Sequence, residues 1–458
     1  MTAVSTQTAG SLVAPPARSP LTGRMLVWGG FALLLALAPL AVRSDFGISL
    51  LAQITIAIVA CLSYNMLLGQ GGMLSFGHAV YTGLGTFVAV HAMIAIANGS
   101  MPIPTSLIPL VGGLAGMFFA VILGYVTTKK AGTPFAMITL GIGELVTAMA
   151  LMIPEFFGGE GGVSANRSAG KPFMGITFGS TIQVYYLLAL YTFACTAAMF
   201  AFTRTPLGRM LNAVRDNPER VEFIGYSTQR VRYLSFIIAG LFAGISGGMS
   251  ALNFEIATAE VVGAGRSGLY LLFTFLGGAT FFFGPIIGAL LMVLGFALFS
   301  ELTQAWLLYL GLIFLFMVMY APGGIASLIM MNVRVAAHKK LHRLWSWYAM
   351  LAVAALVFLA GAAALIEMVY HLQLGSNSGS TLRYFGMTLD VASAASWLGA
   401  LAVTVVGIVA FESVRRRFAA VWGAIQSEIE RDMTFKEPDI AAPTGGAAAA
   451  AEAEEGKP

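Results

Sequence analysis

The sequence predicts an all-α polytopic membrane protein, and three observations lead to this class. Of the 458 residues, 58% are hydrophobic and only 10% are charged, whereas soluble domains carry about 25% charged residues. Apolar runs long enough to cross a bilayer recur along most of the chain. The Lys and Arg residues gather in alternate segments between these runs, as the positive-inside rule requires of cytoplasmic loops.

We expect twelve spans, about ten in the body of the chain and two extra ones near its C-terminus. They lie near residues 25–42, 46–68, 73–97, 106–128, 133–153, 182–203, 234–254, 267–283, 285–301, 304–321, 347–368 and 391–411. Arg18 and Arg24 precede the first run, as in a signal peptide, but its length and the spans that follow favour an uncleaved span. The glycines around Pro285 leave open whether 267–301 is two spans or includes a re-entrant segment.

The basic residues also predict the orientation. With the N-terminus inside, the cytoplasmic segments contain Arg18, Arg24, Lys129, Lys130, Arg204, Arg209, Arg215, Arg220, Arg230, Arg232, Arg334, Lys339, Lys340, Arg343 and Arg415 to Arg417. Few basic residues fall in the outer segments. Both termini are therefore expected in the cytoplasm.

Composition divides the chain into five parts. These are a disordered tail at 1–24, a transmembrane domain at 25–330, an extension with two additional spans at 331–411, an amphipathic helix at 412–436 and a disordered tail at 437–458. The helix carries an apolar stripe at steps of three or four residues: Val414, Phe418, Val421, Trp422, Ile425, Ile429 and Met433. We favour a place in the lipid interface for this stripe, with docking on a partner as the alternative.

Glycine is unusually frequent in the spans. Gly240, Gly244 and Gly248 form two consecutive GxxxG steps, which let helix backbones approach closely within a membrane. The segment 67–90 carries further glycines, and Gly71-Gly72 is a place where a helix can break to line a cavity. Tight helix packing alone remains the alternative interpretation of that segment.

The residues needed for enzymatic chemistry are missing. Gly170-Lys171 and Gly456-Lys457 are both followed by Pro, where a phosphate-binding loop requires Ser or Thr. His338 and His342 have helical spacing, but they belong to a basic segment and predict no metal site. Glu144 is the one acid near the middle of a predicted span, and it is either functional or hydrogen-bonded to a neighbouring helix. We expect no enzymatic activity, no cofactor on this chain and no nucleic-acid partner.

The longest internal cytoplasmic segment, 203–236, has its own pattern. An apolar stripe formed by Leu207, Met210, Leu211 and Val214 recurs at helical spacing, and Asp216-Asn217-Pro218 then signals a helix stop and restart. Such a helix pair suits the docking of a soluble partner. An ordinary surface loop would explain the arginines but not the stripe.

Several segments together resemble the permease subunits of branched-chain amino-acid ABC importers of the LivM type. They are "NMLLGQGGMLSFGHAVYTGLGTF" at 65–87, "PFAMITLGIGELV" at 134–146, "GGEGGVS" at 158–164, the loop and span beginning "LGRMLNAVRDNPERVEF", then "LGGATFFFGPIIGA" and "YAPGGI". The resemblance covers about residues 25–330 in the family's order. Residues 335–458 extend beyond the family's usual end.

The resemblance implies a heteromeric importer in the bacterial inner membrane. Its expected partners are ABC ATPase subunits that bind ATP-Mg, a second homologous permease subunit and a periplasmic substrate-binding protein. It implies ATPase-coupling roles for Arg204, Arg209, Arg215, Asp216, Asn217, Glu219 and Gly225. It implies places near the translocation pathway for Gly71, Gly72, Ser75, His78 and Glu144. Urea, short amides and aromatic acids are alternative substrates, and a stand-alone channel or facilitator is an alternative of a different class.

Overall fold

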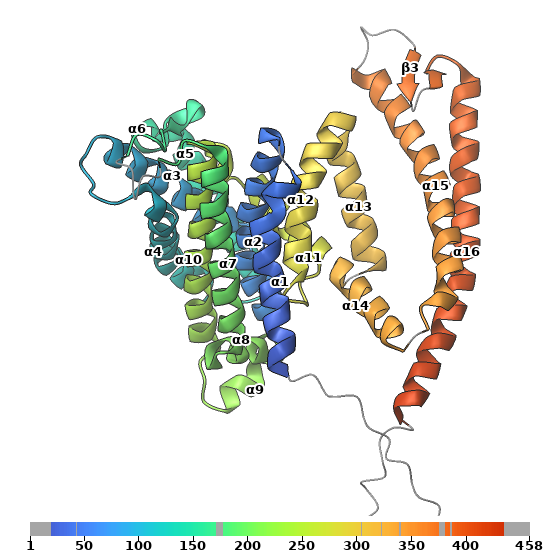
Figure 1. Ribbon diagram of the computed structural model, residues 1–458, viewed down its shortest axis with the longest axis horizontal. Helices are drawn as coiled ribbons and strands as arrows, with labels where there is room; N and C mark the ends of the chain where they lie inside the picture. The colour runs from blue at the N-terminus through green and yellow to red at the C-terminus, as the bar shows by residue number, and fades with distance from the viewer. Residues whose placement is uncertain are drawn as a thin grey trace, which may run out of the picture. The chain divides into compact units, whose positions relative to one another are not determined.

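The computed structural model describes residues 20–42, 44–170, 177–303, 305–321, 323–338, 340–374, 381–384 and 387–434. These residues are largely helical, which confirms the predicted class (Figure 1). They form two compact units, one built from the described residues up to Leu302 with Leu310–Ser327, and the other from Thr303–Tyr309 with the described residues from Leu328 onward. The predicted disorder of 1–19 and 437–458 lies outside the described residues.

Nine helices of the described ranges are long and apolar enough to cross a membrane. They are α2 (Asp45–Gly71), α3 (His78–Ala97), α4 (Ile108–Thr127), α5 (Thr133–Met152), α7 (Thr181–Arg204), α10 (Thr228–Phe254), α12 (Gly284–Leu302), α15 (His342–Leu374) and α16 (Ala394–Thr434). Each corresponds to one of the runs found in the sequence. The chain is thus a multi-pass membrane protein.

Three of the twelve expected spans are not among these nine helices. Helix α1 (Pro20–Ala41) begins inside the predicted tail 1–24, at a proline that suits a first helical turn, and its apolar part covers Met25–Ala41. Helix α11 (Ala264–Gly277) has 14 residues, about 21 Å of rise against a hydrocarbon core of about 30 Å. Helix α13 (Trp306–Tyr320) meets α14 (Gly324–Ala337) at a bend of 50°, and the two would count together as one crossing.

Small residues bring α4 and α10 into backbone contact in the first unit. A Cβ atom on Gly244 would lie 2.3 Å from the carbonyl oxygen of Gly112 and 2.9 Å from the Cα of Gly116. Gly248 approaches Pro109 in the same way, and Gly240 approaches Ala120. Van der Waals packing between small residues is the main attraction that helices retain in lipid. The three glycines named from the sequence therefore lie along one helix–helix contact.

The remaining short elements of the first unit connect the long helices. Helices α6 (Pro154–Phe157), α8 (Pro206–Asp216) and α9 (Pro218–Phe223) are too short to cross. Strands β1 (Val163–Ser164) and β2 (Ile256–Ala257) pair in antiparallel fashion, and the 3-10 helix η3 (Ala259–Val262) leads into α11. Val261 and Val262 of η3 pack against Gly83 of α3, so a non-crossing segment reaches a buried part of the helix bundle.

The second unit is a long helical hairpin. Helices α15 and α16 pack along each other, with Gly361 against Thr404 and Gly407 against Phe358, and β3 (Thr381–Tyr384) pairs with β4 (Met387–Asp390) between them. The carboxylate of Glu367 on α15 accepts hydrogen bonds from the hydroxyls of Thr303 and Tyr309. These contacts tie the start of α13 to α15.

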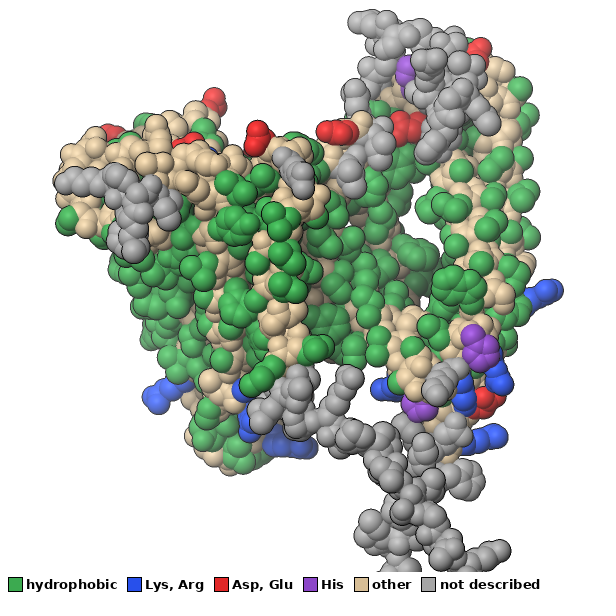
Figure 2. Space-filling view, in the orientation of Figure 1, with side chains coloured by type: hydrophobic (Ala, Val, Ile, Leu, Met, Phe, Trp, Pro, Cys, Tyr) green, Lys and Arg blue, Asp and Glu red, His purple; other side chains and the backbone are tan. Residues whose placement is uncertain are grey.

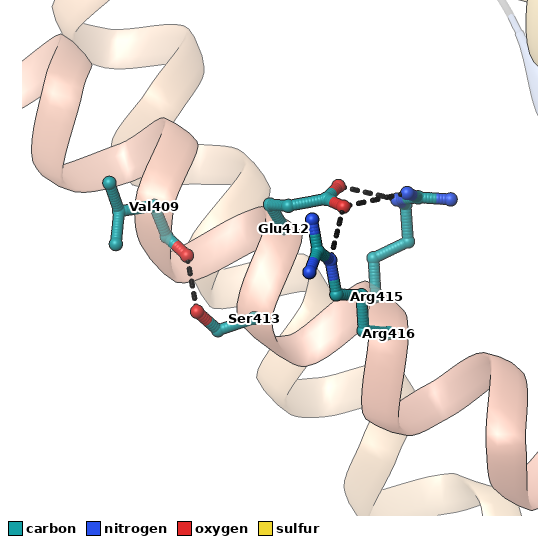
Figure 3. Close-up of polar contacts among 5 residues, drawn as sticks. All are labelled: Val409, Glu412, Ser413, Arg415 and Arg416. Atoms are coloured by element: carbon teal, nitrogen blue, oxygen red, sulfur yellow. Dashed lines mark hydrogen bonds and ion pairs between the residues drawn. The ribbon is translucent and has the colours of Figure 1, made fainter.

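The predicted separate helix at 412–436 is instead the continuation of α16, which runs without a break from Ala394 to Thr434. Figure 3 shows the junction, where Glu412 accepts hydrogen bonds from Nε of Arg415 at 2.7 Å and from Nε of Arg416 at 2.8 Å. Pairs of this kind, three and four residues apart, stabilise an exposed helix. The polar residues after 411 therefore belong to the same helix as the span predicted at 391–411.

The apolar stripe of α16 lies against the protein's own helices. Ile425 and Ile429 are 2% and 1% exposed and cluster with Val335 of α14 and Leu344 of α15. Phe418, Val421 and Trp422 border this cluster. The preferred assignment of the stripe to the lipid interface is thus wrong, because a stripe at helical spacing indicates that a face is covered without indicating by what.

Candidate functional site

The site begins with the sequence between α7 and α10, which folds as the helix pair α8–α9. Pro206 opens α8, and the Thr205 hydroxyl accepts a hydrogen bond from the Gly208 N–H at 3.2 Å, a typical N-cap. Asn217 ends α8 and caps α9 by accepting from the Arg220 N–H at 2.9 Å. The predicted stop and restart at Asp216-Asn217-Pro218 is therefore where one helix ends and the next begins.

The apolar stripe of α8 faces the helix bundle. Leu211 is fully buried and Val214 is 2% exposed, while Leu207 and Met210 are half-buried. The stripe thus seats α8 on the bundle and is not itself the surface that a partner would contact.

All seven predicted coupling residues are exposed, and they follow one another along this one segment: Arg204, Arg209, Arg215, Asp216, Asn217, Glu219 and Gly225. Arg215 and Asp216 form an ion pair at 2.9 Å, and Gly225 has a φ of +88° that permits the turn after α9. Figure 2 shows Lys and Arg side chains gathered at the end of the first unit where α8 and α9 lie, with hydrophobic side chains covering its flanks.

Sequence reasoning missed the most exposed apolar side chains of this segment. Phe223 is 89% exposed, Ile224 is 62% exposed and Tyr226 is 53% exposed; we call these three residues the α9 turn. Beside it lies an open depression of about 430 Å³ lined by Arg204, Pro206, Arg209, Met210, Ala213 and Ile224. The sequence did contain a signal for them: large apolar residues in a polar loop, at positions that do not fit the helical spacing of the stripe.

Arg215 connects the helix pair to α2. Its guanidinium donates a hydrogen bond to the carbonyl oxygen of Gly69, one of the last carbonyls of α2. The final turn of a helix lacks intrahelical partners for its carbonyl groups, and a cation there also meets the negative end of the helix dipole. Arg215 is therefore exposed at the surface and is also a structural cap of α2.

Gly71 and Gly72 lie at this same junction. Gly72 has a φ of +62° and closes α2 with a left-handed cap, in which its N–H bonds to the Leu68 carbonyl and the N–H of Met73 bonds to the Leu67 carbonyl. A Cβ on Gly72 would lie 2.9 Å from Cγ of Arg215. These glycines end the helix against α8, so the structure groups them with the coupling residues.

Ser75 and His78 lie deeper, between α2 and α3, and both are fully buried. Nε2 of His78 is 2.9 Å from the hydroxyl of Ser63, and the carbonyl of Ser75 accepts from the Tyr64 hydroxyl at 2.9 Å. Nδ1 of His78 and the Ser75 hydroxyl have no hydrogen-bond partner among the described residues. In this conformation neither side chain reaches the surface of the bundle.

Glu144 occupies a different environment from the other predicted pathway residues. It lies on the exposed face of α5, in line with Gly141 one turn and Met137 two turns before it. Thr139, on the opposite side of the helix, is buried. The structure thus does not bring Glu144 and His78 to one surface.

The helical bundle and the basic, partly apolar helix pair at one end of it define a multi-pass membrane protein with an exposed helix pair between two of its spans. Comparison with known proteins identifies the family. The profile described as "Branched-chain amino acid transport system / permease component" matches residues 30–322, well over half of the chain, and the chain belongs to this family of ABC transporter permeases. Permease subunits of this kind are non-catalytic membrane components that work with ATPases and binding proteins.

Individual relatives span two substrate classes. The chain is 26% identical over 318 residues to the high-affinity branched-chain amino acid transport system permease protein LivM of Escherichia coli K12, covering 64% of this chain and 74% of the relative. The LivM protein of Salmonella typhimurium LT2 is 25% identical with the same coverage. The guanosine ABC transporter permease NupQ of Bacillus subtilis 168 is 27% identical over 150 residues, which is 30% of this chain and 45% of the relative. No solved structure matches the chain.

Proposed function

We propose that this chain is the permease subunit of an ATP-driven importer that moves branched-chain amino acids delivered by a periplasmic binding protein. The observation that carries this proposal is the α8–α9 pair, which is anchored by a buried stripe and presents Phe223 and Ile224 outward. A facilitator that works alone has no need of such a surface. The similarity to two LivM proteins supports the choice of substrate.

The proposal divides the work between subunits. Partner ATPases bind and hydrolyse ATP-Mg, and the α9 turn inserts its apolar side chains into them, with the surrounding arginines setting the orientation of docking. A second homologous permease subunit completes the passage. We place the complex in the bacterial inner membrane with both chain termini in the cytoplasm, which the clustering of basic residues around α8 and α9 supports.

Glu144 has a role in this proposal that follows from its exposure. A carboxylate on the outer face of a membrane-spanning helix is costly against lipid. Facing a second permease subunit across a hydrated passage, it is solvated and attracts the ammonium group of a zwitterionic amino acid. We therefore assign Glu144 to the pathway and the exposed face of α5 to the subunit boundary.

Nucleosides are the second candidate substrate, because nucleoside and guanosine permeases also match parts of the chain. Leucine and guanosine can be distinguished in proteoliposomes that contain the whole complex, with ATP inside and the binding protein outside. We expect labelled leucine to accumulate and excess unlabelled isoleucine or valine to compete with it. Accumulation of guanosine without leucine would replace the amino-acid assignment with the nucleoside one.

A further inference from the structure

The segment between α2 and α3, residues 72–77, touches two parts of the bundle that the proposed function assigns to different tasks; we call it the α2–α3 strap. Its first end lies under α8. Arg215 holds the last turn of α2 through the Gly69 carbonyl, and the Leu211 side chain would be 3.1 Å from a Cβ on Gly71. No free space separates α8 from the end of α2.

The other end of the α2–α3 strap lies against α5. The hydroxyl of Thr139 accepts a hydrogen bond from the Phe76 N–H at 3.1 Å and donates one to the Ala136 carbonyl at 2.8 Å. A Cβ on Gly77 would lie 2.2 Å from the Thr139 carbonyl oxygen. Thr139 is 3% exposed, so this contact between the strap and α5 is closed to solvent.

Buried polar contacts also fix the middle of the strap and the residues that follow it. The Tyr64 hydroxyl holds the Ser75 carbonyl, and the His78 ring is 2.9 Å from Ser63. The hydroxyl of Ser267 on α11 accepts from the Ala79 N–H at 2.9 Å. Because packed interfaces shift between discrete arrangements instead of deforming continuously, a segment held this way moves as a unit with the helix end to which it belongs.

We propose that Thr139 is a positioning residue that transmits movement of α8 to α5 through the α2–α3 strap. The inference rests on the proposed function, since it requires α8 to follow the ATPases and α5 to border the pathway. Among the described residues, the Thr139 hydroxyl is the one side-chain group that accepts a hydrogen bond from the Phe76 N–H. Glu144 lies five residues further along the same helix, so a shift of α5 at Thr139 moves the acid that faces the pathway.

Two pairs of variants of the full complex test this proposal. Thr139→Ser and Thr139→Ala both remove the γ-methyl group, but only serine keeps the hydroxyl. Thr139→Val keeps the shape and removes the hydroxyl. Thr147→Val is its matched control, because the Thr147 hydroxyl bonds to the Gly143 carbonyl of its own helix and has no other partner among the described residues. The readout is substrate imported per ATP hydrolysed in proteoliposomes, together with ATPase stimulation by the binding protein.

We expect Thr139→Ala and Thr139→Val to import about three- to tenfold less substrate per ATP, the change that corresponds to one lost hydrogen bond. Stimulation of the ATPase should persist, and Thr139→Ser and Thr147→Val should match the unsubstituted complex. Equal ratios for Thr139→Ala and Thr139→Ser would overturn the role of the hydroxyl while leaving the proposed function in place. An unsubstituted complex without ATP-dependent uptake would overturn both.

Discussion

Gly244 shows how a single residue position sets the distance between two helices. Its Cα faces Gly112 and Gly116 of α4. Gly85 of α3 approaches from another side, and a Cβ on Gly85 would lie 2.8 Å from the Gly244 Cα. Three helices therefore meet where none of them has a side chain. In a membrane, where apolar surface gains nothing by leaving lipid, such contact is a major source of helix association.

Replacing Gly244 by leucine should destabilise the bundle by about 1–3 kcal/mol or more, because the new side chain has no space between α4 and α10. Thermal unfolding in detergent measures this as a lower midpoint. Gly30→Leu on α1 is the control, since nothing lies within 4 Å of a Cβ placed there. Equal midpoints for the two variants would mean that the glycine contact contributes no stability.

Glu144 is the residue that the proposed function places at the passage between the two permease subunits. Glu144→Gln preserves shape and hydrogen-bonding capacity but removes the charge, so uptake should fall while assembly with the partner subunits is unchanged. Glu155→Gln changes an exposed acid of α6 outside the spans and serves as the control. Uptake by Glu144→Gln equal to that of the unsubstituted protein from acidic to neutral pH would exclude a role for the charge.

At the scale of elements, the α8–α9 pair uses different residues to pack against the bundle and to face outward. Its stripe is buried in the bundle, while the α9 turn is among the most exposed apolar surfaces outside the long helices. Large aromatic side chains at protein interfaces commonly carry a disproportionate share of the binding energy. The turn therefore has the composition expected of a docking site.

Phe223→Ala should weaken binding of the partner ATPase by about tenfold or more, the effect typical of an interface hot spot. Titrating the purified permease with ATPase in detergent measures the affinity. Leu190→Ala on α7, a 64% exposed residue of a spanning helix, is the matched control. Unaltered affinity for the Phe223 variant would assign docking to another surface.

A second prediction at the scale of elements concerns the C-terminal half of α16. Ile425→Asp places a charge in the cluster with Val335 and Leu344, so α16 should separate from α14 and α15 and become sensitive to trypsin. Gly423→Asp, where a Cβ meets nothing within 4 Å, should leave the digestion pattern unchanged. Resistance of the Ile425 variant would indicate that the stripe faces lipid after all.

The elements differ in how far the sequence predicts them. Long apolar runs such as those of α2 and α10 are predicted well because length and hydropathy alone decide whether a helix can cross. The break at Gly71-Gly72 was also predicted, but the start of α3 after the strap at 72–77 was not, because it depends on tertiary contacts such as Gly77 on Thr139. The candidate site divides in the same way. The coupling segment was predicted from the spacing of its apolar residues, but the contact of Gly72 with Arg215 was not, because it joins distant parts of the sequence.

At the scale of the whole molecule, the family region and the extension fall largely in different units. The family match ends at 322, and the second unit takes in the described residues from Leu328 onward together with Thr303–Tyr309 of the family region. That unit has its own apolar clusters and ion pairs, including Lys340 and Arg343 with Glu428. The transport function proposed for the chain therefore rests on the first unit, to which the coupling segment, the strap and Glu144 all belong.

The central claim is that ATP hydrolysis by partner subunits drives substrate through this permease. Leucine uptake into proteoliposomes, with the binding protein outside and either ATP or a non-hydrolysable analogue inside, tests it most directly. The account predicts accumulation above the external concentration with ATP and none with the analogue. Equal uptake in both cases, levelling off at the external concentration, would contradict it and identify the chain as a facilitator.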